Sequence, residues 1–252
     1  MLKHAGISLL AVALAAQTAS AQLQKVDIEL SLLVDVSGSV SETEYGLQKT
    51  GYINVFNNAT FWTAFQSSGR TLAVQYAEWS GATQQLGTGW YLITNSSQAA
   101  TFATVINVWN RAFSGNTGVA AALNYGVTSI TGNSFDGTRK IIDISSDGCD
   151  NERGNVTGAR ANAVNNGITI NAITIGTSPF DCSGTLANWY QSNVVTTNGF
   201  LEIADDFADF NTAIQRKIGR EVSVVPEPSS FALLGAGVLA LLAIARGRRD
   251  AA

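Results

Sequence analysis

Leu32-Leu33-Val34-Asp35-Val36-Ser37-Gly38-Ser39-Val40 joins an apolar run to a polar turn. Its apolar half predicts a buried strand, and its second half brings one aspartate and two serines into a tight turn before a helix. In open α/β sheets, ligands bind where the strand ends lead into loops. The pattern Asp35-x-Ser37-x-Ser39 therefore predicts a binding site at one edge of a sheet.

Segments with strand-like and helix-like spacing alternate along nearly the whole chain outward from this stretch. A capping box at Ser41–Glu44 predicts where the first helix begins. The expected fold class is therefore α/β: a doubly wound, mostly parallel sheet with one antiparallel edge strand and helices on both faces. Strands are expected over residues 26–36, 71–79, 85–93 (the antiparallel edge), 139–145, 168–175 and 199–203, and helices over 41–57, 98–109, 119–130, 156–165, 186–194 and 207–220, with a short extra turn at 61–65.

Residues 1–21 are expected to be a secretory signal peptide. The chain starts with Met1-Leu2-Lys3-His4, continues with an apolar run from Ile7 to Ala16, and reaches Ala19-Ser20-Ala21. A basic start, a short apolar core and small residues at the exit are typical of a cleavable signal. A buried helix or a membrane anchor is the alternative, but the run is short for a membrane span.

Residues 225–252 form a second segment that is expected to lie outside the domain. Val225-Pro226-Glu227-Pro228 is followed by an apolar run over residues 231–245 and then by a cluster of arginines. The prolines interrupt regular structure, and the run is slightly short for a full span at about 1.5 Å per residue. The arginines would hold the extreme C-terminus in the cytoplasm.

This order of motif, apolar helix and basic tail resembles the PEP-CTERM sorting signal of Gram-negative bacteria. The resemblance implies that Val225, Pro226, Glu227 and Pro228 are the sorting motif and that the helix inserts transiently into the inner membrane. An exosortase would then process the tail, and the protein would pass from an inner-membrane-anchored intermediate to the cell surface or extracellular matrix. A permanent single-pass anchor is the alternative.

The composition of residues 22–224 limits what the domain can do. This stretch is long enough for one domain with a sizeable core. It holds 11 Lys and Arg against 17 Asp and Glu, a net charge of −6, and shows no basic patch, which argues against nucleic acid as a partner. The single histidine, His4, lies in the expected signal peptide. Without it the exported part would lack Ser-His-Asp and Cys-His catalysis and His-ligated zinc, and we expect no enzyme.

Two cysteines, Cys149 and Cys182, remain in this stretch. In an oxidising compartment such a pair is most simply a disulfide, and two cysteines without histidine make a poor zinc site. We therefore expect a bridge between Cys149 and Cys182. It would connect the loop after strand 139–145 with the loop after the next strand.

Hydroxyl and carboxyl side chains occur in three loops at expected strand ends. Asp35, Ser37 and Ser39 lie in the first loop, Thr117 in the second, and Asp147 in the third. Hard oxygen donors suit Mg²⁺, Mn²⁺ or Ca²⁺ better than zinc or copper. Two carboxylates and three hydroxyls would leave a divalent cation with an open position, which favours an acidic group supplied by a partner.

The order and spacing of these five residues resemble the metal-ion-dependent adhesion site of von Willebrand factor A domains. The resemblance implies that Ser37 and Ser39 bind the metal directly and that Thr117 does so when a ligand is engaged. It also implies that Asp35 and Asp147 act mostly through water. Mg²⁺ is the expected cation, with Mn²⁺ and Ca²⁺ as alternatives, and a protein that offers an acidic side chain is the expected partner. Taken alone, the first motif could also be a turn in which Asp35 caps the next helix.

More narrowly, residues 74–81, 141–151 and 206–218 resemble a bacterial family of secreted A-domain proteins of unknown function. Ser146 departs from the glycine that many A domains have before the aspartate. Asp143 and Glu78 are expected to be hydrogen-bonded structural residues. The five tryptophans are expected to pack in the core and at its edges rather than to bind carbohydrate.

Three functions are consistent with these patterns. The first is an exported module that binds a protein partner through its metal. The second is a structural component of the matrix or surface whose metal only stabilises the fold. The third, a metal-activated hydrolase, is disfavoured because no general base stands out beyond Asp35 and Asp147.

Overall fold

A computed structural model describes residues 22–176, 182 and 184–223. The expected signal peptide, the motif at residues 225–228, the apolar run at residues 231–245 and the basic tail lie outside the described residues. Within the described part of the chain, no helix is both long enough and apolar enough to cross a membrane.

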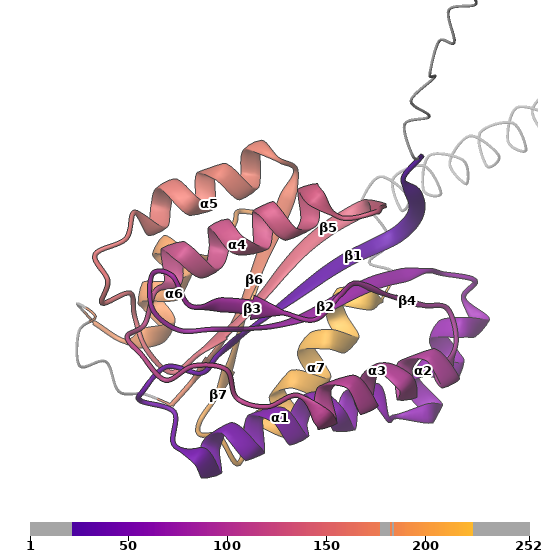
Figure 1. The fold of residues 1–252 in the computed structure, drawn as a ribbon, viewed down its shortest axis with the longest axis horizontal. Helices are drawn as coiled ribbons and strands as arrows, with labels where there is room; N and C mark the ends of the chain where they lie inside the picture. Colours follow the sequence, from indigo (N-terminus) through magenta and orange to yellow (C-terminus); the bar gives the residue numbers. More distant parts are fainter. Residues whose placement is uncertain (1–21, 177–181, 183, 224–252) are drawn as a thin grey trace, which may run out of the picture.

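A seven-stranded, mostly parallel sheet forms the centre of the domain (Figure 1). Its order is β3-β2-β1-β5-β6-β7, and β4 also pairs with β2. The central strand β1 is buried at every position from Ile28 to Asp35, as its nearly continuous apolar sequence predicts. The strands are β1 (Gln24–Asp35), β2 (Leu72–Trp79), β3 (Gln85–Gly87), β4 (Tyr91–Ile93), β5 (Phe135–Ser146), β6 (Ile168–Ile175) and β7 (Leu201–Ala204).

The expected antiparallel edge is present, but it is divided into two short strands. β3 and β4 both pair antiparallel with β2, and the register shifts by one residue between them. Such a shift is a β-bulge. Thr88 lies at the bulge, where its backbone N–H donates to Tyr76 and its hydroxyl accepts from the Tyr76 N–H. The bulge therefore keeps the backbone of β2 hydrogen-bonded where the edge strand is interrupted.

Helices cover both faces of the sheet, as expected for a doubly wound fold (Figure 1). The larger apolar cluster lies on the face covered by α1, α2, α3 and α7, and the other on the face covered by α4, α5 and α6. The helices are α1 (Glu42–Phe56), α2 (Ala59–Ser67), α3 (Ser96–Val108), α4 (Val119–Gly132), α5 (Val156–Asn165), α6 (Leu186–Asn193) and α7 (Phe210–Val222). The expected fold class is confirmed.

Several element boundaries differ from the expectation for identifiable reasons. The segment expected as a short turn at residues 61–65 is the nine-residue helix α2, capped by the Asn58 side chain and anchored by the fully buried Trp62. β5 begins at Phe135 rather than at residue 139, because residues 135–137 pair with the start of β1. α7 begins at Phe210 rather than at residue 207, because Asp206 accepts a hydrogen bond from the Asp209 N–H in a turn before the helix.

The tryptophans pack in the core and at its edges, as expected. Trp62 and Trp79 are fully buried. Trp90, Trp109 and Trp189 are partly buried against the apolar clusters.

Replacing either of two glycines in α1 with alanine should change the stability of the protein in opposite directions. A Cβ at Gly51 would lie 2.8 Å from Cδ1 of the buried Phe210 in α7, whereas a Cβ at Gly46 meets nothing within 4 Å. Gly51→Ala should lower the free energy of unfolding by roughly 1–3 kcal/mol through overpacking. Gly46→Ala should raise it by about 0.5–1 kcal/mol, because alanine favours the helix. Urea unfolding of both variants measures this, and equal effects would contradict the close packing of α1 on α7.

Candidate metal centre

Three loops meet at the carboxyl edge of the sheet. β1 ends at Asp35 and β5 at Ser146, and the two strands pair in parallel up to Val34 opposite Ser145, so the loops that follow them are neighbours. The segment before α4 joins them, because the Gly38 N–H donates to the Gly115 carbonyl at 2.8 Å. All five residues expected to form the metal site therefore lie in one cluster.

The hydroxyls of the site form a continuous chain of contacts that ends on a carboxylate. Thr117 Oγ1 lies 3.4 Å from Ser37 Oγ, and Ser37 Oγ lies 3.1 Å from Ser39 Oγ. Ser39 Oγ in turn donates to Asp147 Oδ1 at 2.8 Å. Ser37 and Thr117 are buried, whereas Ser39 is exposed and Asp147 is half-buried. The cluster is therefore open to solvent on the side of Ser39 and Asp147.

Asp35 lies behind the serines and is fully buried. Its Oδ1 accepts from the Ser37 N–H at 2.8 Å, and its Oδ2 accepts from the Ser146 hydroxyl at 2.5 Å. Both oxygens are thus held by the loops themselves, which agrees with an indirect role for Asp35 at the metal. Ser146, which departs from the glycine of many A domains, supplies one of these bonds. Apart from its position before Asp147, nothing in the sequence indicates that role for Ser146.

Burial raises the pKa of both carboxyl groups. Burial first, and then the charge of Asp147, raises the pKa of Asp35 to about 7 from its ordinary value of 3.8. Burial also raises the pKa of Asp147. Among the described residues, no Lys or Arg forms an ion pair with either group. A bound cation would supply the positive charge that these two carboxylates lack.

The donor set fits a small divalent cation. In an octahedral Mg²⁺ site with oxygens at about 2.1 Å, neighbouring donors lie about 3 Å apart. The Ser37–Ser39 separation of 3.1 Å matches that spacing, and the Thr117–Ser37 separation of 3.4 Å is slightly wider. No group of three or more His, Cys, Asp or Glu side chains gathers in the described part of the chain. The hydroxyl and carboxyl oxygens that meet here are hard donors, which suit a divalent cation.

The third loop holds the second in place through Asp150 and Asn151. The Asn151 side chain accepts from the Thr117 N–H at 2.8 Å, and its own N–H donates to the Thr117 carbonyl at 2.9 Å. Asp150 accepts from the N–H of Ala120 in the first turn of α4 and from that of Gly154. These two residues therefore position the backbone of Thr117. Neither residue is recognisable as part of the site from the sequence alone.

Arg111 positions the first loop. The sequence patterns do not mark this residue as part of the site either. Its Nη2 donates to the carbonyls of Val36, Ser37 and Val40 at 3.1, 3.0 and 2.7 Å. Its Nη1 pairs with Glu42 at 2.6 Å, and its side chain is only 11% exposed. A single arginine in an irregular segment has no periodicity that would mark it, so only the structure reveals this contact.

Glu78 has the hydrogen-bonded structural role expected for it. It accepts from the Tyr45 hydroxyl at 2.7 Å and from the Ala112 N–H at 2.8 Å. Because Arg111 also lies over the Tyr45 ring, these residues connect α1, the end of β2 and the segment before α4. Asp143 differs from the expectation, because neither of its oxygens has a hydrogen-bond partner among the described residues. It forms a buried ion pair with Lys217 instead.

Cys149 and Cys182 are joined by a disulfide, with their Cα atoms 5.8 Å apart. The bridge attaches the third loop, two residues after Asp147, to the segment before α6. It therefore limits the movement of Asp147 relative to the sheet.

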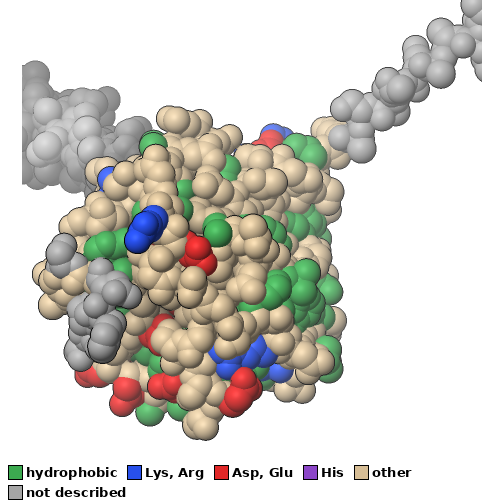
Figure 2. Space-filling view, turned by 60° about the vertical axis from the view of Figure 1, so that its left-hand side comes forward, with side chains coloured by type: hydrophobic (Ala, Val, Ile, Leu, Met, Phe, Trp, Pro, Cys, Tyr) green, Lys and Arg blue, Asp and Glu red, His purple; other side chains and the backbone are tan. Residues whose placement is uncertain are grey.

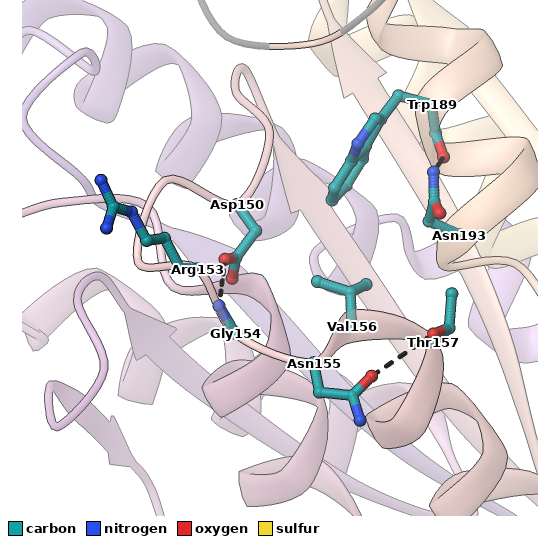
Figure 3. A pocket seen from close by; sticks show the side chains of 8 residues that line it. All are labelled: Asp150, Arg153, Gly154, Asn155, Val156, Thr157, Trp189 and Asn193. Carbon is teal, nitrogen blue, oxygen red and sulfur yellow. Dashed lines mark hydrogen bonds between the residues drawn. The ribbon is translucent and has the colours of Figure 1, made fainter.

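A shallow hollow of about 290 Å³ lies beside the third loop, between that loop and α6 (Figure 3). Val156 lies between Asn155 and the Trp189 ring in this view, and the Arg153 side chain points away from Trp189. Asp150 is on the same rim and is already bound to the Gly154 N–H. The hollow thus extends the surface around the candidate metal centre in the direction of α6.

The fold is that of von Willebrand factor A domains. It is similar to a von Willebrand factor type A structure from Catenulispora acidiphila, with a TM-score of 0.56 and 13% identity over 79% of this chain and 43% of that chain. It is also similar to the pilus adhesin SpaC from Lactobacillus rhamnosus GG in an open conformation, with a TM-score of 0.58 and 16% identity over 80% of this chain and 31% of that chain. At such identities the likeness concerns the fold alone.

A third similar structure is proximal thread matrix protein 1 from the mussel byssus, solved with a zinc-occupied MIDAS motif. Its TM-score is 0.55 with 16% identity, over 80% of this chain and 49% of that chain. This chain therefore spans less than half the length of each of the three.

The chain belongs to the family described as protein of unknown function DUF1194, whose model matches residues 25–226. A PEP-CTERM protein-sorting motif matches residues 224–249. Both resemblances stated from the sequence are thus confirmed. No curated protein sequence matches the chain.

The raised pKa of Asp35 predicts how Mg²⁺ stabilisation depends on pH. The metal-free fold holds a proton on Asp35 up to about pH 7, whereas the unfolded chain loses it near 3.8, so this group destabilises the metal-free fold as pH rises between the two values. Mg²⁺ should therefore raise the melting temperature most above pH 7. Near pH 5 it must displace the proton, and its affinity should fall roughly 100-fold. Thermal melts with and without MgCl₂ measure this, and an equal Mg²⁺ effect at both pH values would contradict it.

Arg111→Met should destabilise the first loop. It removes three bonds from one guanidinium to the carbonyls of Val36, Ser37 and Val40, so the free energy of unfolding should fall by roughly 2–3 kcal/mol. Arg216→Met is the matched control, because Arg216 is 53% exposed and forms a surface ion pair with Glu202. The control should cost at most about 1 kcal/mol. Similar losses in the two variants would argue against a positioning role for Arg111.

Proposed function

We propose that this chain is an exported, metal-dependent protein-binding module that acts at the bacterial cell surface or in the extracellular matrix. The observation that carries the proposal is the convergence of Asp35, Ser37, Ser39, Thr117 and Asp147 on one open edge of the sheet. The sorting motif at residues 224–249 supports export. The pilus adhesin among the similar structures supports a binding role.

Each residue of the site has a distinct task in this proposal. Ser37, Ser39 and Thr117 hold the cation through their hydroxyl oxygens, and Asp35 and Asp147 supply negative charge. When bound, the cation offers a positive centre with an open position for a carboxylate. Ser39 and Asp147 lie on the solvent side, so a partner's acidic side chain can approach there. Mg²⁺ is the proposed cation, with Mn²⁺ and Ca²⁺ as alternatives.

The surface charge agrees with a protein partner rather than nucleic acid. Figure 2 shows basic side chains in separate places on the visible face, with acidic side chains between them. Nucleic-acid binding needs a continuous basic surface. We also propose that the module binds rather than catalyses, because residues 22–224 contain no histidine and the two carboxylates of the site are assigned to the cation.

A structural role in the matrix is the second candidate. The sorting motif and the likeness to a byssus thread matrix protein favour it. In that case the cation would stabilise the fold without contacting a partner.

Calorimetry with MgCl₂ tests the site. The double variant Ser37→Ala/Ser39→Ala should lose Mg²⁺ binding, because it removes two of the three hydroxyl donors. Ser41→Ala is the control, since Ser41 caps α1 from the same loop without contacting the other hydroxyls. Equal affinity in the wild type and the double variant would reject the metal site.

A capture experiment with extracellular matrix from the producing bacterium then distinguishes the binding module from the structural role. A partner that binds in MgCl₂, is released by EDTA and is absent with the double variant would support the binding module. If EDTA lowers the melting temperature and leaves every captured protein in place, the structural role is correct instead.

A further inference from the structure

Lys217, Asp143 and Glu221 form a charged cluster that the metal centre does not use. All three side chains are fully buried between α7 and the sheet. Lys217 Nζ lies 2.7 Å from Asp143 Oδ2 and 2.7 Å from Glu221 Oε1. One amine therefore touches two carboxyl groups in a region without solvent.

The carboxyl groups of this cluster are poorly satisfied. Apart from the ion pair with Lys217, neither oxygen of Asp143 has a hydrogen-bond partner among the described residues, and Oε2 of Glu221 has none. Asn171 donates to the other oxygen of Glu221 at 2.9 Å. Two buried carboxylates and one ammonium would leave an uncompensated negative charge, which is costly in an apolar interior. Burial, followed by the charge of Asp143, raises the pKa of Glu221 to about 8, so Glu221 carries a proton at neutral pH.

An aromatic ring covers the amine. Lys217 Nζ lies 5.7 Å from the centroid of the Phe200 ring, and the Arg220 guanidinium lies 3.8 Å from the same centroid. The ring thus adds an apolar wall on one side of the amine. Burial of an ammonium and a carboxylate in this apolar site costs free energy that a neutral linkage would not.

We propose that Lys217 and Asp143 join in an intramolecular isopeptide bond, with Glu221 as the proton carrier. One proton passes from Lys217 Nζ to an oxygen of Asp143, the amine attacks Cγ of Asp143, and a new C–N bond forms. Glu221 gives its proton to the departing oxygen of Asp143 and takes one from the attacking nitrogen. Glu221 is therefore protonated again at the end of the reaction. The C–O bond of Asp143 breaks, and one water molecule leaves. No oxidant, reductant or other reactant is needed.

Two features of the site favour this dehydration. The fold holds the amine and the carboxyl group in contact, which gives effective concentrations on the order of 10⁵ M or more for well-oriented groups. Exclusion of water favours release of the product water, and the amide replaces a buried ion pair by a neutral group.

The bond would join the last helix of the domain to a central strand. α7 ends at Val222, and the sorting motif begins at residue 224. Asp143 lies in β5, four residues before Asp147. Unravelling of the domain from its C-terminal end would therefore stop at Lys217.

Peptide mass spectrometry of the reduced and alkylated full chain tests the proposal. Trypsin would normally release residues 141–153 as a linear peptide and would cleave after Lys217. With the bond, trypsin does not cleave after Lys217, and residues 141–153 appear joined to residues 217–220 at the summed mass minus one water. Linear 141–153 should be nearly absent. Recovery of that peptide in full yield, with cleavage after Lys217, would overturn the proposal in favour of an ordinary buried ion pair.

Two comparisons make the test specific. Lys140 and Asp136 are the same residue types at a similar distance, 2.9 Å, but both are about 30% exposed. They should remain unlinked in the same digest. Glu221→Gln keeps the size of the side chain and removes the proton carrier, so the linked peptide should fall at least tenfold. An undiminished amount of linked peptide in Glu221→Gln would show that Glu221 is not the proton carrier.

Discussion

Burial of the Asp35 carboxylate at the end of the central strand is the constraint on which the candidate site depends. Asp35 has no exposed surface, and each of its oxygens accepts a hydrogen bond from a different loop. Ser37 belongs to the loop after β1 and Ser146 to the end of β5. The carboxylate therefore fixes the relative position of two loops at the same time as it supplies negative charge. This explains why a carboxyl group is kept at the end of an otherwise apolar strand.

The surrounding residues hold the loops without filling the space in front of the hydroxyls. Arg111 binds carbonyls of the first loop from behind, and Asn151 binds the backbone of Thr117 from the side of the third loop. Both use backbone atoms, so the side chains of Ser37, Ser39 and Thr117 remain available. A backbone held by its neighbours, with hydroxyls grouped beside Asp147, is an arrangement that suits a cation site, because donors already in place need little reordering when the ion binds.

Much of the fold and the first loop of the candidate site could be predicted from the sequence because their signals are local. Apolar runs, the capping box at Ser41 and the oxygen donors of Asp35-x-Ser37-x-Ser39 are visible within short windows. Arg111, Asn151 and the Ser146–Asp35 bond could not be predicted, because each joins segments that are distant in the chain. The extension of β5 back to Phe135 has the same origin: pairing with β1 places Asp136 and Gly137, which are poor strand formers, in a strand.

β5 connects the features that matter for an exported protein. Its end carries Ser146, Asp147 and, through the next loop, the disulfide at Cys149. Its buried middle carries Asp143, which faces Lys217 of α7. The sorting motif follows directly after α7, so a force applied to the C-terminal end of the domain reaches the sheet first through this helix. A cluster between α7 and β5 is therefore well placed to keep the metal edge intact while the C-terminal end is under load, since both are attached to the same strand.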